Sequence, residues 1–192
     1  APEKPGVITR VTGCDMELSH YLIESNGEKV NNPRYLINAT RNLRRKQKSL
    51  SRKQKGSANR GKARLRLAAV HKRVANARAD FQHKLSRTMI DENQAVIVGT
   101  LKSANMMKDH HLARAIGDAG WHGFLMKLEY KAAAAGGKLD QWFASSKTCH
   151  GCGYKVSEMP LNKRIWQCPF CRVEHDRDIN AAINIQRKGT TA

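Results

Sequence analysis

The stretch GVITRVTGCD, residues 6–15, is rich in β-forming residues and ends on an acid. A second apolar run follows at residues 21–24, and the turn Ser25-Asn26-Gly27 leads from it to Lys29 and Val30. Asn-Gly between two such runs is a strong hairpin signal, because both residues tolerate the positive φ that tight hairpin turns need. We therefore expect strands within residues 6–40.

The second half of the chain alternates strand and helix patterns. Residues 95–98 (AVIV) are typical of a buried strand, and residues 138–143 predict another. Between them, apolar residues recur on one helical face from Leu112 to Ala132 and predict a helix that Gly136-Gly137 ends. Apolar residues from Ile179 to Ile185 predict a closing helix. Together these elements predict an α/β fold with a mixed sheet.

The middle of the chain is strongly basic. The 192 residues carry a net charge of +19, and residues 41–94 are predicted to form two helices broken around residues 56–61. Between residues 41 and 87 there is one acid, Asp80, against these basic residues: Arg41, Arg44, Arg45, Lys46, Lys48, Arg52, Lys53, Lys55, Arg60, Lys62, Arg64, Arg66, Lys72, Arg73, Arg78, Lys84 and Arg87. Like charges at this density repel unless something neutralises them, so nucleic-acid phosphates are favoured over a solvated face.

Other classes of protein are less compatible with the composition. No apolar run approaches the roughly 20 residues of a membrane-spanning helix, and the N-terminus lacks the apolar segment of a secretory signal. A cytosolic protein is expected, with one core and a small appendage.

Four of the five cysteines form two CxxC pairs, Cys149 with Cys152 and Cys168 with Cys171. Fifteen residues separate the pairs, which is the spacing of a structural zinc site closed by four thiolates. The alternatives are two disulfides or a redox pair, but tandem pairs do not fit a thioredoxin-like motif. His150 and His175 lie nearby but are not needed as ligands, and Cys14 is expected in the core.

Three aspartates are candidates for metal-dependent chemistry. Asp15 ends a predicted strand, while Asp176 and Asp178 open the closing helix. Carboxylates from separate elements can hold two Mg²⁺ ions, which activate water and stabilise a leaving oxygen. Aspartate at a helix start also has a simpler explanation as a cap. Asp91 and Glu92 are expected to mark a helix end.

Seven motifs resemble the RuvC-like nuclease half of TnpB, the RNA-guided DNA endonuclease of bacterial transposons, which is related to type V CRISPR effectors. The resemblance covers nearly the whole chain and rests on these segments: 13–15 (GCD), 32–36 (NPRYL), 51–59 (SRKQKGSAN), 118–121 (DAGW), 128–132 (LEYKA), 145–149 (SSKTC) and 176–182 (DRDINAA).

The resemblance implies an RNase H-like (RuvC-like) domain in residues 1–144 and 174–192, with a basic helical insertion at 41–94 and a zinc ribbon at 145–173. It implies that Asp15 is the first catalytic carboxylate and Asp178 the third, with Asp176 beside it. It also implies guide RNA and target DNA as partners, with the basic helices along the heteroduplex. A bacterial or archaeal cytosol, in association with the nucleoid, is the implied location.

Two positions depart from the family pattern. Gly99 and Thr100 stand where the family has its second acid, Glu, and a following Asp. Because glycine offers no oxygen, Mg²⁺ is expected to bind weakly or not at all. Glu17 stands where the family has Gly, and strand periodicity would put it on the face of Asp15. A partial replacement of the lost acid by Glu17 is a minor hypothesis.

The sequence therefore favours a nuclease-defective, nucleic-acid-binding relative of TnpB. An active metal-dependent endonuclease and a scaffold or oligomerisation subunit are the alternatives. Family members carry a long region before the first acid, whereas 14 residues precede Asp15 here. A separate N-terminal half, other protein chains, or loss of that half are the corresponding expectations.

Overall fold

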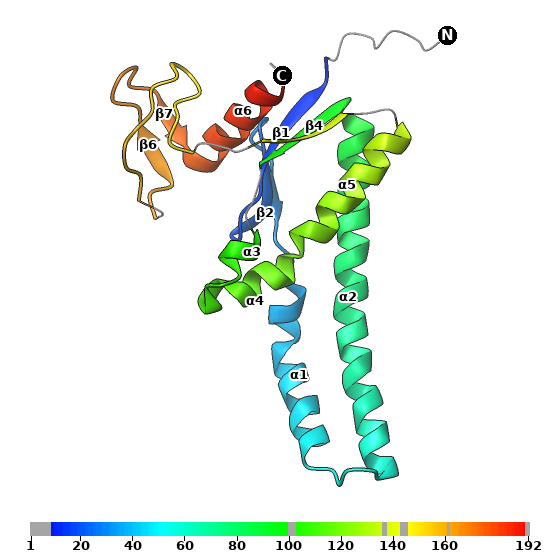
Figure 1. Cartoon of the computed structure of the whole chain (residues 1–192). Coiled ribbons are helices and arrows are strands. Elements are labelled where there is room, and N and C mark those ends of the chain that lie inside the picture. The colour runs from blue at the N-terminus through cyan, green and yellow to red at the C-terminus, as the bar shows by residue number, and fades with distance from the viewer. Residues whose placement is uncertain (1–8, 100–102, 136–137, 143–145, 161, 191–192) are drawn as a thin grey trace.

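The computed structural model describes residues 9–99, 103–135, 138–142, 146–160 and 162–190 (Figure 1). Its centre is a five-stranded sheet in the order β3-β2-β1-β4-β5. The strands are β1 (Val11–Asp15), β2 (His20–Glu24), β3 (Lys29–Asn31), β4 (Ala95–Gly99) and β5 (Lys138–Trp142). The predicted α/β fold with a mixed sheet is confirmed.

Strand directions decide which residues share an edge of the sheet. β2 is antiparallel to both β1 and β3, with Asp15 opposite Ile23, whereas β1, β4 and β5 run parallel. Because Cys14 pairs with Val98, Asp15 and Gly99 both lie at the carboxyl edge of the parallel strands. Polar side chains at that edge of an open sheet commonly form a site.

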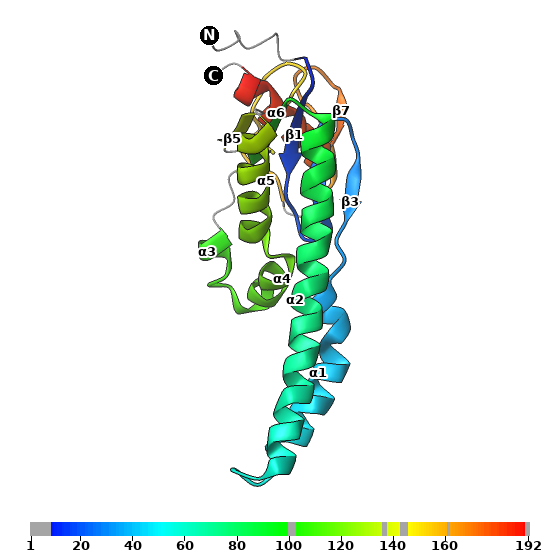
Figure 2. The same cartoon turned by 90° about the vertical axis from the view of Figure 1, so that its right-hand side faces the viewer.

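In the described part of the chain, six helices surround the sheet or extend from it. They are α1 (Tyr35–Ser51), α2 (Ala58–Glu92), α3 (Ser103–Met106), α4 (His110–Ala119), α5 (Trp121–Ala135) and α6 (Arg177–Thr190). In both views α1 and α2 form a hairpin that projects away from the sheet (Figure 1 and Figure 2). We call this pair the basic hairpin (residues 35–92).

The two faces of the sheet bury different residues. Cys14, Val96 and Val98 join a core with residues of α2, α4 and α5, which confirms Cys14 as a core residue. On the other face, α6 approaches β1 closely. A Cβ at Gly13 would lie 2.2 Å from the carbonyl oxygen of Ala182, so only glycine fits there. Glycine thus sets how near α6 can come to the strand that carries Asp15.

Polar side chains tie the basic hairpin to this core. The Asp118 carboxylate accepts N–H bonds from Leu36 (2.8 Å) and Ile37 (3.1 Å), and so caps α1 from a neighbouring helix. The Gln82 amide donates to the Tyr21 hydroxyl, and Tyr21 packs edge-on against Phe81 of α2. The root of the hairpin is therefore held rigidly to the sheet.

Several predicted boundaries shift. A single helix through 112–132 was wrong, because Gly120 takes a left-handed conformation (φ 62) and separates α4 from α5. The basic region breaks earlier than expected, since Ser57 caps α2 by accepting from Arg60 N–H. Glu92 ends α2 as expected. The predictions on residues 6–8, 136–137 and 143, and on Thr100, lie outside the described residues.

Candidate functional site

Asp15 and Asp178 meet at the carboxyl edge of the sheet. β1 ends on Asp15, and Asp178 lies in the first turn of α6, which packs across β1. Burial, followed by the negative charges of Asp178 and Glu17, raises the pKa of Asp15 to about 7. Mutually repelling carboxylates of this kind are typical of sites that hold a cation.

Asp176 has a different role from its neighbour. One of its oxygens accepts the N–H groups of Asp178 (3.0 Å) and Ile179 (3.2 Å), and the other pairs with Lys29. Partial burial opposes ionisation, but Lys29 and these two donors hold the pKa of Asp176 below its usual value. Asp176 therefore caps α6 and fixes the position of Asp178.

Arg164 lies between two of the acids. Its Nη1 is 2.8 Å from Glu17 Oε2 and 2.9 Å from Asp178 Oδ2, and its Nη2 donates to the hydroxyl of Ser19. Burial and the charge of Glu17 raise the pKa of Asp178, while Arg164 opposes that increase. The guanidinium thus provides an internal positive charge within the carboxylate cluster (Asp15, Glu17, Asp178).

Glu17 reaches this cluster without being in a strand, since β1 ends at Asp15. Its other oxygen lies 2.8 Å from His20 Nδ1. Burial opposes ionisation, but His20 and Arg164 keep the pKa of Glu17 below normal. Its carboxylate is therefore charged and already paired at neutral pH.

Gly99 ends β4 beside Asp15. A Cβ at Gly99 would lie 3.7 Å from Asp15 Oδ1 and 3.1 Å from the Ile185 side chain. A side chain at this position would thus start next to the carboxylate cluster. Glycine supplies none of the oxygens that a divalent cation needs from that direction.

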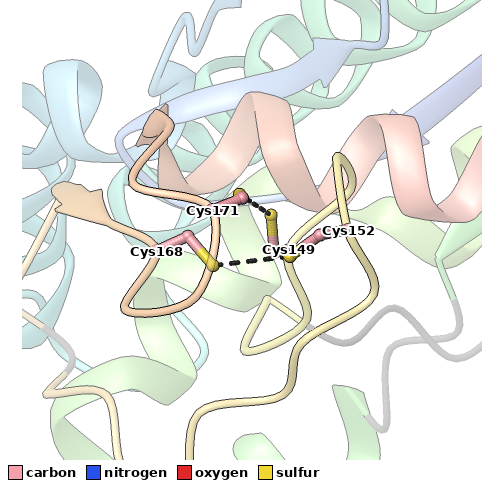
Figure 3. Close-up of side chains that lie close together, drawn as sticks. All are labelled: Cys149, Cys152, Cys168 and Cys171. Atoms are coloured by element: carbon pink, nitrogen blue, oxygen red, sulfur yellow. Dashed lines mark hydrogen bonds between the residues drawn. The ribbon is translucent and has the colours of Figure 1, made fainter.

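The four paired cysteines come together on a hairpin that follows β5 (Figure 3). We call residues 146–176 the cysteine hairpin, which includes β6 (Ile165–Gln167) and β7 (Glu174–Asp176). The sulfurs lie within 4.8 Å of one another, with Cys149–Cys171 at 3.7 Å and Cys152–Cys168 at 3.6 Å. Ligands about 2.3 Å from a tetrahedral Zn²⁺ would be about 3.8 Å apart. The arrangement can hold one metal ion.

Groups around Cys168 favour its thiolate form, whereas the pKa of Cys152 is raised. Burial opposes ionisation of Cys168, but the N–H groups of Cys171 and Phe170 donate to its sulfur, and its pKa falls to about 7. His175 is buried, with Nε2 3.1 Å from the sulfur of Cys149. A histidine N–H that donates to a ligand in this way orients the ligand and stabilises its charge.

The cysteine hairpin is anchored on α6. Asn180 is 1% exposed; its Nδ2 donates to Thr148 O, and its Oδ1 accepts from His150 N–H at 2.9 Å. Asn184 donates to the same Thr148 oxygen. The cysteine hairpin is thus attached to α6, the helix whose first turn carries Asp178. Arg164, just before β6, links the hairpin to Asp178 a second time.

The predicted phosphate-binding side chains lie along the basic hairpin, and α1 buries none of its residues. Among the described residues, five of them have intramolecular partners, and one of these is Arg45, which donates to Asn42 Oδ1 at 3.3 Å. Arg60 donates to the carbonyls of Leu50 and Lys53, and Arg78 to Gly117 O. Lys84 pairs with Asp80 and Arg87 with Asp91. Arg60 and Arg78 therefore also stabilise the fold, whereas the exposed pairs of Lys84 and Arg87 contribute little.

Two models of known protein families match successive parts of the chain. A family model described as "Probable transposase" (OrfB_IS605) matches residues 3–110, and a second, "Cas12f1-like, TNB domain", matches residues 121–185. The chain belongs to the TnpB family.

Within the described residues, no helix is long and apolar enough to cross a membrane.

Relatives of the TnpB family match most of the chain. A putative RNA-guided DNA endonuclease from Streptomyces pristinaespiralis is 44% identical over 96% of the chain and 46% of its own length. Another from Mycobacterium tuberculosis (strain CDC 1551 / Oshkosh) is 36% identical over 83% of the chain and 36% of its length. The chain thus spans less than half of these relatives. The cryo-EM structure of the Cas12f1–sgRNA–target DNA complex has a similar fold, with a TM-score of 0.63 at 17% identity over 95% of the chain and 39% of its own.

Sequence reasoning identified Asp15, Asp176, Asp178 and the four cysteines, and the structure places them in two neighbouring groups. It missed Arg164, Lys29 and Asn180. Arg164 and Lys29 each lie 147 residues from an acid that they bind. Asn180 was visible only as part of the motif after Asp178.

Proposed function

We propose that this chain is the RuvC-like, RNase H-fold part of a TnpB-type protein that binds guide RNA and target DNA but does not cut. Gly99 is the observation that carries the proposal. It removes an oxygen ligand beside Asp15, at the position where the resemblance places the second catalytic acid. The carboxylates that remain are a remnant of a nuclease site.

The residues at the acid cluster do not fit a pair of Mg²⁺ ions. Two of the three carboxylates, Glu17 and Asp178, are already bonded to the Arg164 guanidinium. A cation would have to displace that positive charge while gaining no ligand from Gly99. Catalytic metal chemistry is therefore not assigned to this chain.

The cysteine hairpin does fit a Zn²⁺ ion held by Cys149, Cys152, Cys168 and Cys171. Four sulfurs close the coordination shell, so the metal would be structural. Its contribution would be to stabilise the hairpin and so to position Arg164 and the start of α6. The proposed nucleic-acid surface is the basic hairpin, where the positive charge is concentrated.

The test pairs a cleavage assay with a binding assay. We expect no Mg²⁺- or Mn²⁺-dependent cutting of single- or double-stranded DNA above that of Asp15→Ala, with any copurifying RNA present. Binding should weaken steeply with salt, because each neutralised phosphate adds about −0.9 to the slope of log K against log salt. Cutting by the unmodified chain would refute the nuclease defect, and a flat salt response would refute phosphate binding.

Gly99→Glu provides a gain-of-function arm. Its Cβ would lie 3.7 Å from Asp15 Oδ1, and the nearest atom to that Cβ would be the end of the Ile185 side chain, at 3.1 Å. Recovered Mg²⁺-dependent cutting would show that the rest of the remnant site is competent. Gly99→Gln is the matched control, because it has nearly the same size without the charge.

A second candidate is an active endonuclease that uses Glu17 in place of the missing acid. The location of Glu17 in the carboxylate cluster favours it, and its pairing with Arg164 and His20 opposes it. Measured cutting that disappears in Glu17→Gln would select this candidate over the first.

A further inference from the structure

Glu17 is the one acid of the carboxylate cluster that departs from the family pattern, which has glycine at this position. It lies in the segment between β1 and β2, and its side chain is 13% exposed. Oε1 accepts the His20 N–H at 3.1 Å and lies 2.8 Å from His20 Nδ1, while Oε2 lies 2.8 Å from Arg164 Nη1. Because both oxygens are bonded, the Glu17 carboxylate is held in one orientation, toward Arg164.

Arg164 connects three segments that are distant in the sequence. Nη1 contacts Glu17 and also lies 2.9 Å from Asp178 Oδ2, and Nη2 donates to Ser19 Oγ at 3.3 Å. Glu17 and Ser19 precede β2, Asp178 is in the first turn of α6, and Arg164 lies directly before β6. One guanidinium thus joins the sheet, the closing helix and the cysteine hairpin.

A glutamate at position 17 makes this place favourable for a guanidinium. The side chains of Glu17 and Asp178 are 13% and 12% exposed, so two negative charges lie close together with little water around them. Carboxylates in such surroundings need a cation or a proton. A planar guanidinium can donate to both, and its charge-assisted hydrogen bonds are about twice as strong as neutral ones. Glycine at position 17 would leave Arg164 with Asp178 alone.

A divalent cation competes poorly with Arg164 at this place. Mg²⁺ gives up its hydration water reluctantly and demands a near-octahedral set of oxygens. Arg164 is part of the chain, and tethered groups act at effective concentrations of about millimolar. An ion that bound both carboxylates would have to break the contacts of Arg164 with Glu17 and Asp178. It would also detach the cysteine hairpin from the sheet at this point.

We infer that Glu17 turns the acid cluster into a metal-free clasp, in which Arg164 takes the place of a cation and fastens the cysteine hairpin to the sheet. The inference rests on the proposed function and deepens it, because it assigns a role to the acids of a protein that does not cut. Gly99 and Glu17 then oppose metal binding independently. Gly99 withholds a ligand, whereas Glu17 is a positioning residue that holds a competing positive charge in place.

The experiment measures the melting temperature of the full chain with and without Ca²⁺. Ca²⁺ prefers oxygen ligands, so the four cysteines do not interfere. Arg164→Met removes the guanidinium and leaves Asp15, Glu17 and Asp178 without it. This variant should melt below the unmodified chain without Ca²⁺. At about 10 mM Ca²⁺ its melting temperature should rise by about 3–6 °C, given the Kd of about 1 mM of a weak protein site. The unmodified chain should shift by less than about 1 °C.

Lys163→Met is the matched control, because it removes the same charge from the neighbouring, exposed residue of the hairpin. Its melting temperature should be the same with and without Ca²⁺. An equal response of Lys163→Met and Arg164→Met would show that general charge attracts Ca²⁺, and would overturn the inference. An Arg164→Met chain that Ca²⁺ does not stabilise, or an unmodified chain that it does, would overturn it as well.

A variant of Glu17 provides a test that keeps Arg164. In a chain that carries Gly99→Glu, adding Glu17→Gly should tighten Ca²⁺ binding roughly 10-fold in isothermal titration calorimetry. That is about the effect of losing one charge-assisted hydrogen bond, here the one that holds Arg164 in competition with the ion. If Glu17 were a replacement ligand, the same change would weaken binding. The sign of the effect therefore decides between a clasp and a ligand.

The outcomes also separate this inference from the proposed function. Mg²⁺-dependent cutting of DNA by the unmodified chain refutes the proposed function. A chain that binds nucleic acid and does not cut, but in which Arg164→Met gains no response to Ca²⁺, refutes only the clasp. Weaker Ca²⁺ binding after Glu17→Gly, in an unmodified chain that does not cut, likewise refutes only the clasp.

Discussion

Asp15→Asn should stabilise the protein relative to the unmodified chain, and by more at pH 8 than at pH 5. The pKa of Asp15 is about 7 in the folded protein, against 3.8 for an ordinary aspartate. The folded state therefore binds this proton more tightly than the unfolded state does. The stability that the proton contributes is fully present below pH 3.8 and is lost as pH rises through 7. An amide has no charge to lose.

The magnitude follows from the two pKa values. At pH 5 only the unfolded state has lost the proton, whereas at pH 8 both states are ionised and the full cost of a buried charge applies. With about 1.36 kcal/mol per pKa unit, the advantage of Asp15→Asn should grow by about 2–3 kcal/mol between pH 5 and pH 8. Solvent relaxation around the charge would reduce that figure.

The assay is urea unfolding of both proteins at the two pH values, in low salt and without added Mg²⁺. Effects of pH on metal binding by the four cysteines are common to both proteins and cancel in the difference. Asp176→Asn is the matched control. The pKa of Asp176 lies below 3.8, so its effect on stability should be the same at pH 5 and pH 8. A difference for Asp15→Asn that stays flat, or shrinks with pH, would refute a buried, repelled carboxyl group at this edge.

Three other perturbations test the packing of α6 and the cysteine hairpin. Asn180→Ala should cost about 2–3 kcal/mol in urea unfolding, because its hydrogen bonds to Thr148 O and to the N–H and ring Nδ1 of His150 are lost, whereas Asn184→Ala should cost about 1. Gly13→Ala should cost about 3 kcal/mol or more by forcing α6 off β1, whereas Gly117→Ala, with open space around it, should gain up to about 1 in the same measurement. Chelating the zinc ion that we propose for the four cysteines should unfold the hairpin and shift Trp166 fluorescence to the red. An unshifted spectrum after chelation would show that no metal holds the hairpin.

The spacing of residues along the sequence was sufficient to predict much of the fold and the cysteine cluster. The CxxC pairs predicted a group of four sulfurs, because each pair is a single tight turn that orients its own ligands. The Asn-Gly turn predicted the β2–β3 hairpin for the same reason, and the absence of a carboxylate at Gly99 follows from residue identity alone. The concentration of positive charge in residues 35–92 is likewise visible in composition alone.

Contacts between distant segments required the tertiary structure. Strand periodicity predicted that Glu17 lies on the same face as Asp15. Glu17 does lie near Asp15, but it is outside β1, which ends at Asp15. Its carboxylate is linked to that of Asp178 through Arg164. The break at Gly120 was also hidden, because apolar periodicity continues across it and only the backbone conformation separates α4 from α5.

The sequence by itself determined the family, the cysteine cluster, the charge and the presence of glycine at position 99. The tertiary structure decided that Arg164 lies between Glu17 and Asp178. It also decided that Arg60 and Arg78 stabilise the fold. The physical reason is range. Turn geometry and residue identity act within a few positions, whereas Arg164, 147 residues from Glu17, meets it only in the folded structure, in which α6 packs against Gly13.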